Sequence, residues 1–291
     1  MNLKNIFTEI EKTDPEIYDR LDTRRNIMKG FGNLSGKLAL AAVPLALSSL
    51  LNKAYAGDSG QRVDSINDVL NYALTLEYLE AGFYNSIVGS PGYLTASATA
   101  QAALSKIADD ENKHVAFLQT VLGAAAVPTP TFDFTGGNGS GAGPFAGYLN
   151  SYAIQLAMAQ TFEDTGVRAY KGQATALMSD NDILTAALNI HSVEARHASH
   201  IRQMRRALGA AGAVPAGVDL KPYITLNQSG IAAPFDAAVA ASYAGEEATT
   251  QATLNLLTIG GMTFTAEDAS AAFDETLDMA QVLAIVDPFI V

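Results

Sequence analysis

Two copies of the pattern Glu-x-x-His constrain the fold of this chain more than any other feature. The chain has only four histidines in 291 residues, and two of them follow a glutamate by three positions: His114 follows Glu111, and His197 follows Glu194. By chance, two such pairs would be a roughly 1% event. Residues three apart on an α-helix share a face, so each pair can direct a carboxylate and an imidazole to one point beside its helix.

Two further glutamates extend these pairs into a repeat. Glu77 lies 34 residues before Glu111, and Glu163 lies 31 residues before Glu194. The order is a single glutamate followed by Glu-x-x-His, and then the same order again. This self-similarity predicts two helix pairs related by an internal repeat.

Each half of the repeat also carries a tyrosine at the same distance from its first glutamate. Tyr84 follows Glu77 by seven residues, and Tyr170 follows Glu163 by seven. These candidate catalytic tyrosines could hydrogen-bond carboxylates or act as one-electron donors, or they could be core aromatic residues with a satisfied hydroxyl. Glu80 also points near the face of Glu77 and is an alternative ligand, but the shared spacing favours Glu77.

Apolar residues at three- and four-residue intervals predict four long helices around these motifs. Residues 123–144 have no helical period, and this connection is longer than antiparallel neighbours need. We expect it to carry the chain back along the bundle, so that the second and third helices run parallel. Its glycines predict a linker rather than a phosphate loop, because no strand precedes them. The helices are expected over about residues 65–88, 96–122, 145–178 and 182–208.

The expected fold class is therefore all-α, a four-helix bundle with one long crossover and a C-terminal extension of helices and loops. We expect the bundle over residues 57–212, and an extension that packs on it over residues 213–291. Two shorter helical segments, at about residues 235–257 and 266–286, are expected in the extension. Its role is not readable from the pattern.

Four carboxylates and two imidazoles suit two divalent first-row metal ions, with bridging glutamates and open positions for water or oxygen. The chain has no cysteine, so thiolate ligands are excluded. Burying four carboxylates without cations would be very costly, and ordinary solvated helix faces are the alternative if these residues point outward. The candidate ligands are Glu77, Glu111, His114, Glu163, Glu194 and His197.

Other polar residues near these motifs are assigned less specific roles. His191 lies one turn before Glu194 and is either a neighbour of the ligands or a packed or surface histidine. Asp110 and Asp164 adjoin candidate ligands but point elsewhere on their helices, which favours solvated or supporting roles. A cationic last turn that opposes the helix dipole explains the arginines of the fourth predicted helix, Arg196, Arg202, Arg205 and Arg206.

The first 56 residues have the features of an export signal. Paired arginines in "TRRNIMKG", residues 23–30, precede a 14-residue apolar run, residues 38–51, and the small-x-small sequence "AYA", residues 54–56. The run is shorter than the roughly 20 residues that span a bilayer. We expect a cleaved twin-arginine-type signal over residues 1–56, with an uncleaved anchor or a buried helix as the alternatives. The mature chain would then be periplasmic or extracellular.

The net charge of the chain argues against one class of partner. The formal net charge is −12, and residues 57–291 carry −14, because residues 1–56 hold eight of the 18 basic and six of the 30 acidic residues. This balance argues against a nucleic-acid partner, since phosphate binding needs a concentrated basic face. We also expect that the mature chain does not insert stably into a membrane. A homodimer is compatible with the sequence.

The chain resembles the ferritin-like superfamily, in particular exported or desiccation-related ferritin-like proteins of bacteria and plants. The segments that carry this resemblance are "ALTLEYLEAGFY", "DDENKHVAFL", "SVEARHASHI", "YAGEEATTQ" and "AFDETLDMAQVLAIVDPFI". The resemblance covers about residues 64–291. It implies a four-helix bundle whose six candidate ligands hold a pair of metal ions, as in ferritin-like di-iron and di-manganese proteins.

These observations predict an exported di-metal carboxylate protein with two divalent metal ions, iron first and manganese as the alternative. Dioxygen or peroxide would be its small-molecule substrate, in iron oxidation, peroxide removal or stress protection. Ligand types do not separate iron from manganese, so peroxide dismutation like that of manganese catalase stays open. A metal-stabilised binding or structural protein is the alternative from another class. A cage-forming iron store is disfavoured by the long C-terminal extension.

Overall fold

The computed structural model describes residues 66–291, which belong to one compact unit. The predicted export signal over residues 1–56 and the first residues of the predicted bundle, 57–65, lie outside the described residues. The division of the remainder into a bundle and an extension at residue 212 stays a prediction. No helix among residues 66–291 has the length and apolar composition needed to cross a membrane.

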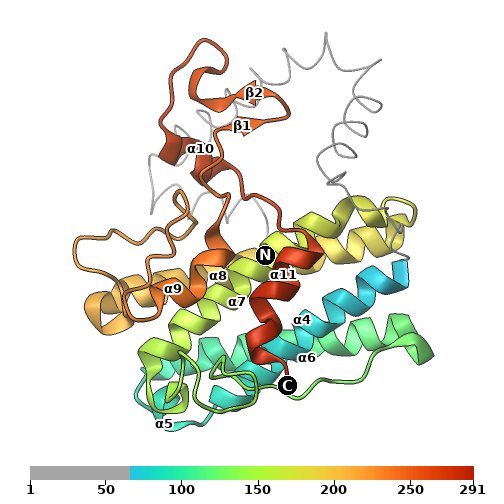
Figure 1. Cartoon of the computed structure of the whole chain (residues 1–291), viewed down its shortest axis with the longest axis vertical. Coiled ribbons are helices and arrows are strands. Elements are labelled where there is room, and N and C mark those ends of the chain that lie inside the picture. Colours follow the sequence, from blue (N-terminus) through green and yellow to red (C-terminus); the bar gives the residue numbers. More distant parts are fainter. Residues whose placement is uncertain (1–65) are drawn as a thin grey trace, which may run out of the picture. The chain divides into compact units, whose positions relative to one another are not determined.

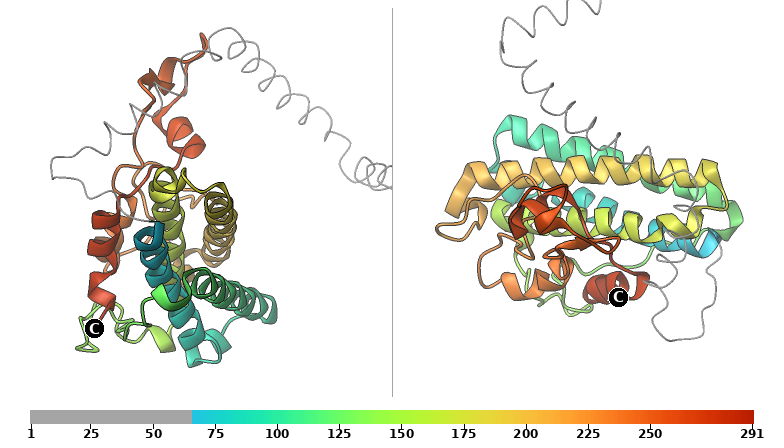
Figure 2. Two further views of the ribbon diagram at one scale, coloured as in Figure 1. Left: turned by 90° about the vertical axis from the view of Figure 1, so that its right-hand side faces the viewer. Right: turned by 90° about the horizontal axis from the view of Figure 1, so that it is seen from above.

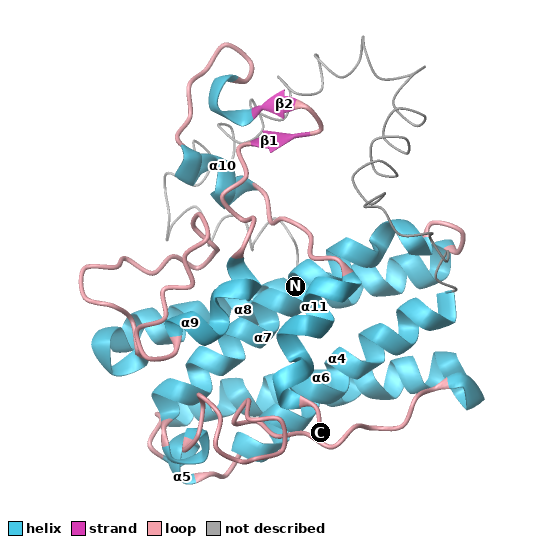
Figure 3. Cartoon of the chain, viewed as in Figure 1, coloured by secondary structure: helices cyan, strands magenta, loops and turns pink. Residues whose placement is uncertain are grey.

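Four long helices dominate the described chain and confirm the all-α fold class (Figures 1 and 3). The hydroxyls of Ser97 and Ser151 cap the N-termini of the second and third long helices. Gly123 and Gly209, both with positive φ, end the second and fourth long helices. The helices are α4 (Ile66–Ile87), α6 (Ala98–Leu122), α7 (Tyr152–Gln173) and α8 (Asn181–Leu208).

The third predicted helix is shorter than the sequence suggested. α7 begins at Tyr152 rather than at 145, because Gly147 adopts the left-handed conformation and the chain makes a 3-10 turn, η2 (Tyr148–Asn150), before the cap. Its last expected turn is the 3-10 helix η3 (Ala174–Leu177). A four-residue helix, α5 (Pro91–Leu94), lies within the break after α4 and was not predicted.

The connection between α6 and α7 runs the length of α4. At its start, the Asn71 side chain bonds the backbone of Ala125 and Val127; at its end, the Gln155 amide on α7 donates to Ser90 just beyond α4. The crossover therefore leads from the N-terminal end of α4 to its C-terminal end. α6 and α7 consequently run parallel, as predicted for a bundle with one long crossover (Figure 1).

α4 and α7 are the central helices of the bundle. α4 packs chiefly on α6, and α7 packs chiefly on α8. The opposite sides of α4 and α7 are covered by the crossover and by α11 (Met279–Val286), as Figure 2 shows with α11 in red. Every residue of α7 from Gln155 to Tyr170 is buried as a result. Polar side chains on these two helices must therefore find partners inside the protein.

The C-terminal part contains less helix than expected. In place of a helix over residues 235–257, the chain forms α9 (Asp236–Val239), the 3-10 helix η5 (Ala240–Tyr243), and a hairpin of β1 (Thr250–Gln251) with β2 (Leu254–Asn255). Polar and β-branched residues in "TTQATLNLLT" favour this extended backbone over a helix. The 3-10 helix η6 (Leu256–Thr258) follows. The second expected helix is interrupted, because α10 (Ala266–Ala272) ends well before α11 begins.

Three arginines of α7 and α8 are buried, and two of them, Arg168 and Arg205, bind the C-terminal part. Arg168 donates to the carbonyls of Ser242 (2.6 Å) and Ala244 (2.7 Å), and its Nε lies 2.7 Å from Glu246 Oε1. Arg205 donates to three backbone carbonyls, including that of Gly230 (2.8 Å). A cationic last turn thus does not account for Arg205, which is fully buried.

A second buried ion pair, Asp164 with Arg202, joins α7 to α8. Arg202 Nε donates to Asp164 Oδ1 at 3.2 Å, and the Tyr243 hydroxyl donates to Asp164 Oδ2 at 2.8 Å. Of the two roles expected for Asp164, the solvated one is therefore excluded, and a buried supporting role remains. The dipole explanation does not account for Arg202, which is buried against this carboxylate. Glu163 and Asp164 are adjacent, so α7 directs one carboxylate into the bundle and the next toward the C-terminal part.

We expect Arg168→Met to destabilise the protein by about 3–5 kcal/mol, because the Glu246 carboxylate and two carbonyls would stay buried without their cation. Arg206→Met is the matched control. Its partner is Asp219 at 3.2 Å, both side chains are more than half exposed, and such pairs contribute about 0–1 kcal/mol. Urea unfolding measures both variants, and equal small losses would show that the Arg168 pair does not anchor this region.

Candidate metal centre

All six predicted ligands meet inside the bundle. Their ligand atoms form two overlapping groups, and within each group all atoms lie within 4.8 Å of one another. The four glutamates are fully buried, and the two histidines are largely buried. The first group is Glu77, Glu111, His114 and Glu194; the second is Glu111, Glu163, Glu194 and His197.

Glu111 lies between the two histidines. Its Oε2 is 2.8 Å from His114 Nδ1, and its Oε1 is 2.8 Å from His197 Nδ1. His114 Nδ1 is also 3.2 Å from Glu77 Oε2 and 3.4 Å from Glu194 Oε1, and His197 Nδ1 is 3.3 Å from Glu163 Oε2. The two groups are thus arranged alike, as the repeat in the sequence predicted, and Glu111 and Glu194 belong to both.

The two tyrosines connect the halves of the repeat. Tyr84 on α4 donates its hydroxyl to Glu163 Oε1 on α7 at 2.5 Å, and Tyr170 on α7 donates its hydroxyl to Glu77 Oε1 on α4. Burial and the adjacent carboxylates raise the pKa of both tyrosines well above the ordinary range, so both remain donors. Glu77 and Glu163 therefore each have one oxygen that accepts a hydrogen bond from a tyrosine and another oxygen that faces the histidine of their group.

Glu80 is buried beside the centre but belongs to neither group. Its equivalent in the second half of the repeat is Gly166. A Cβ atom at Gly166 would come within 2.8 Å of Glu194 Oε2 and 3.1 Å of Glu80 Oε1, so glycine leaves the room that both carboxylates occupy. Sequence reasoning missed Gly166, although the repeat aligns it with a glutamate. His191 is half-buried and also lies outside both groups.

Asp110 approaches the centre from outside. Its Oδ2 lies 3.5 Å from His197 Nε2, the ring nitrogen on the opposite side from Glu111. A carboxylate beside the outer nitrogen of an imidazole fixes the orientation of the ring. The predicted supporting role of Asp110 fits this contact. The second half of the repeat has Val193 at the equivalent position, so it offers no such carboxylate there.

Burial controls the charge of most glutamates in the centre. It raises the pKa of Glu77 to about 7, against the opposing effect of His114. Burial also raises the pKa of Glu80, Glu163 and Glu194, and the charges of neighbouring carboxylates add to this effect. Without a cation, these carboxyl groups therefore retain protons that solvated glutamates release.

The two histidines and Glu111 instead favour their charged forms. Burial tends to lower the pKa of His197, but the carboxylates of Glu163 and Glu111 outweigh it and raise this pKa to about 11. Neighbouring glutamates likewise raise the pKa of His114 against the effect of burial. Burial tends to raise the pKa of Glu111, but the two adjacent imidazoles lower it to about 2. Protons thus occupy the place that cations would take.

The donor set fits metal ions. Six buried atoms of the centre have no hydrogen-bond partner among the described residues, although they converge on one another. Leaving a buried polar atom unpartnered costs about 1–3 kcal/mol, and more for charged groups. Two divalent cations would neutralise four carboxylates and satisfy these atoms. The unpartnered atoms are Glu77 Oε2, Glu111 Oε1, Glu163 Oε2, Glu194 Oε1 and Oε2, and His197 Nδ1.

Comparison with known families agrees with this geometry. Residues 65–207 match the model of the ferritin-like domain, and this range contains all six candidate ligands. No curated protein and no solved structure matches the chain. The match supports the ferritin-like superfamily expected from the sequence, whereas the narrower exported or desiccation-related branch stays a prediction.

We expect the metal-free protein to lose stability as the pH rises from about 5 to about 8. In the unfolded chain, glutamates release protons near 4.5 and histidines near 6.5, whereas the folded protein retains them on Glu77 to about 7 and on His197 to about 11. The unfolded chain therefore binds fewer protons over this range, so rising pH favours unfolding.

Urea unfolding of the metal-free protein at several pH values measures this slope. Metal binding must displace the protons, so the apparent metal affinity should rise over the same range. A metal-free protein that becomes more stable between these pH values would show that the centre does not retain protons in this way.

Proposed function

The chain carries a ferritin-like domain, and we propose that its bundle holds two divalent metal ions, iron before manganese, that react with dioxygen or peroxide. The observation that carries this proposal is the convergence of four fully buried carboxylates and two imidazoles in two overlapping groups. Iron oxidation, peroxide removal or stress protection would be the biological role.

The assignment of ligands follows the two groups. Glu111 and Glu194 belong to both groups and would bridge the ions; Glu77 and His114 would complete one site, and Glu163 and His197 the other. The residues offer four negative charges, which two divalent cations balance. Carboxylate and imidazole ligands suit both Fe(II) and Mn(II), so the choice of iron before manganese rests on metal analysis of the purified protein.

When bound, two ferrous ions would supply two electrons to one dioxygen molecule, which leaves as hydrogen peroxide with two protons from solvent. The residues of the chain contribute the surroundings. The apolar side chains of α4 and α7 exclude bulk water, and Tyr84 and Tyr170 each orient one oxygen of Glu163 and Glu77. The tyrosines lie one hydrogen bond from the ligands, which also suits them to donate an electron.

Export of the folded, loaded protein is part of the proposal. The paired arginines at positions 24 and 25, the apolar run after them and the small residues at 54–56 support a twin-arginine-type route. That route carries folded proteins, so the buried centre would receive its metals before export. The mature protein would then act in the periplasm or outside the cell.

We expect Glu111→Gln to lower the content of both metal ions, because this carboxylate belongs to both groups, and Glu77→Gln to lower chiefly one. Asp109→Asn is the matched control, since Asp109 is an exposed acid on the same helix that pairs with Lys113. Elemental analysis of the purified proteins gives the stoichiometry. A Glu111→Gln variant with unchanged metal content would contradict the ligand assignment.

We also expect the metal-free protein to oxidise added ferrous ion in air and to develop ferric absorption, with His197→Ala doing so much more slowly. Stopped-flow absorption measures both, with ferrous ion in buffer as the reference. A structural role would instead be indicated by two results together. Protein purified from its native export route would hold fewer than one metal ion per chain, and the metal-free protein would oxidise ferrous ion no faster than buffer does.

A further inference from the structure

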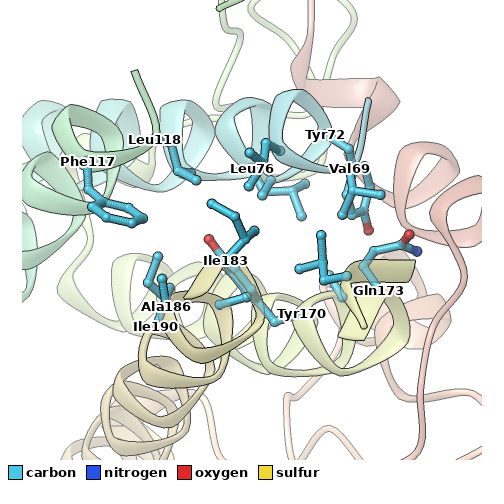
Figure 4. A pocket seen from close by; sticks show the side chains of 15 residues that line it. Val69, Tyr72, Leu76, Phe117, Leu118, Tyr170, Gln173, Ile183, Ala186 and Ile190 are labelled. Carbon is cyan, nitrogen blue, oxygen red and sulfur yellow. The ribbon is translucent and has the colours of Figure 1, made fainter. Parts of the chain in front are cut away.

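An apolar cavity lies in the bundle next to the candidate centre. Side chains from all four long helices line it, with Leu76 from α4, Leu118 from α6, Tyr170 from α7 and Ile183 from α8 around it (Figure 4). About 20 Å³ of it is open to the centre of a water-sized molecule. That space accommodates one small molecule.

One wall of the cavity lies a single helical turn from the ligands. Leu118 follows His114 by four residues, and Ile190 precedes Glu194 by four, which places each about 6 Å along its helix from the ligand. Tyr170 belongs to both places, because it lines the cavity and donates its hydroxyl to Glu77. A molecule in the cavity would therefore be separated from the centre by one layer of side chains.

The chemistry of the walls selects apolar molecules. None of the lining residues is charged, and nearly all are aliphatic or aromatic. A polar solute such as peroxide would lose its hydrogen bonds to water on entry, at a cost that an apolar diatomic gas does not bear. Small apolar cavities of this kind stay dry and bind apolar molecules or xenon.

Polar molecules and ions can approach the centre from its charged, partly exposed side rather than through the cavity. Asp110 and His114 are partly exposed, with 21% and 12% of their side-chain surfaces open, and Lys106 pairs with Asp110 there. Cations and peroxide are compatible with this charged surface. The cavity and the charged surface thus offer the centre two surroundings of opposite polarity.

We propose that the apolar cavity binds dioxygen and delivers it to the metal centre, separately from the polar face used by metal ions and peroxide. This inference rests on the proposed function and narrows it, because it makes dioxygen a substrate that the fold admits by a dedicated site. Ala187, a buried residue of α8 that lines the cavity, offers the position at which to fill it.

The test combines xenon binding with reaction rates in the full-length protein. Xenon binding to the metal-free protein is followed by ¹²⁹Xe NMR, for the wild type, for Ala187→Val and Ala187→Leu, and for Ala102→Leu, an exposed control on α6. The iron-loaded proteins are then mixed with dioxygen or with hydrogen peroxide. The two Ala187 variants keep the experiment interpretable if the larger side chain prevents folding.

We expect xenon to bind the wild type and the Ala102→Leu control, to bind Ala187→Val less, and not to bind Ala187→Leu. The rate with dioxygen should fall in the same order, several-fold in the filled variant, with unchanged iron content and an unchanged rate with peroxide. Absence of xenon binding in the wild type, or an unchanged dioxygen rate in a filled cavity, would overturn the proposal. Xenon binding without any oxygen or peroxide reaction would instead refute the proposed function.

Discussion

The burial of four glutamates in one layer of the bundle is the constraint on which the rest of the structure depends. Four carboxylates that meet in an apolar interior repel one another and have lost their water, so the fold must supply positive charge at that point. The histidines and retained protons do so in the metal-free protein, and divalent cations do so better. The helices, the tyrosine hydrogen bonds and the proposed metal chemistry all follow from this requirement.

The internal repeat meets the requirement twice, but the two halves are not equivalent. Asp110 stands beside the outer nitrogen of His197, whereas Val193 occupies the equivalent position in the other half. Glu80 adds a buried carboxyl group to the first half, and Gly166 leaves space for it in the second. The two groups therefore differ in their neighbouring side chains, and two bound ions would have different surroundings.

The C-terminal part completes the interior as much as the four helices do. Because α4 and α7 are the central helices, their outer sides need cover that a four-helix bundle alone does not provide. The crossover and α11 supply this cover. Arg168 and Arg205 attach the surrounding loops through buried hydrogen bonds, and Arg202 joins α8 to α7 through Asp164. Neighbouring residues of α7, Glu163 and Asp164, thereby connect the centre with the region beyond the bundle.

The sequence by itself determined the helices, the parallel arrangement of α6 and α7, and the six side chains that converge. Helical periodicity and Glu-x-x-His spacing are local properties, and a short-range pattern is enough to place residues on one face. Tertiary structure alone decided that Gly166 makes room for two carboxylates, that the arginines are buried, and that residues 244–265 contain no α-helix. Those outcomes depend on which distant segment occupies the adjacent space, and the spacing of residues along one helix carries no information about that.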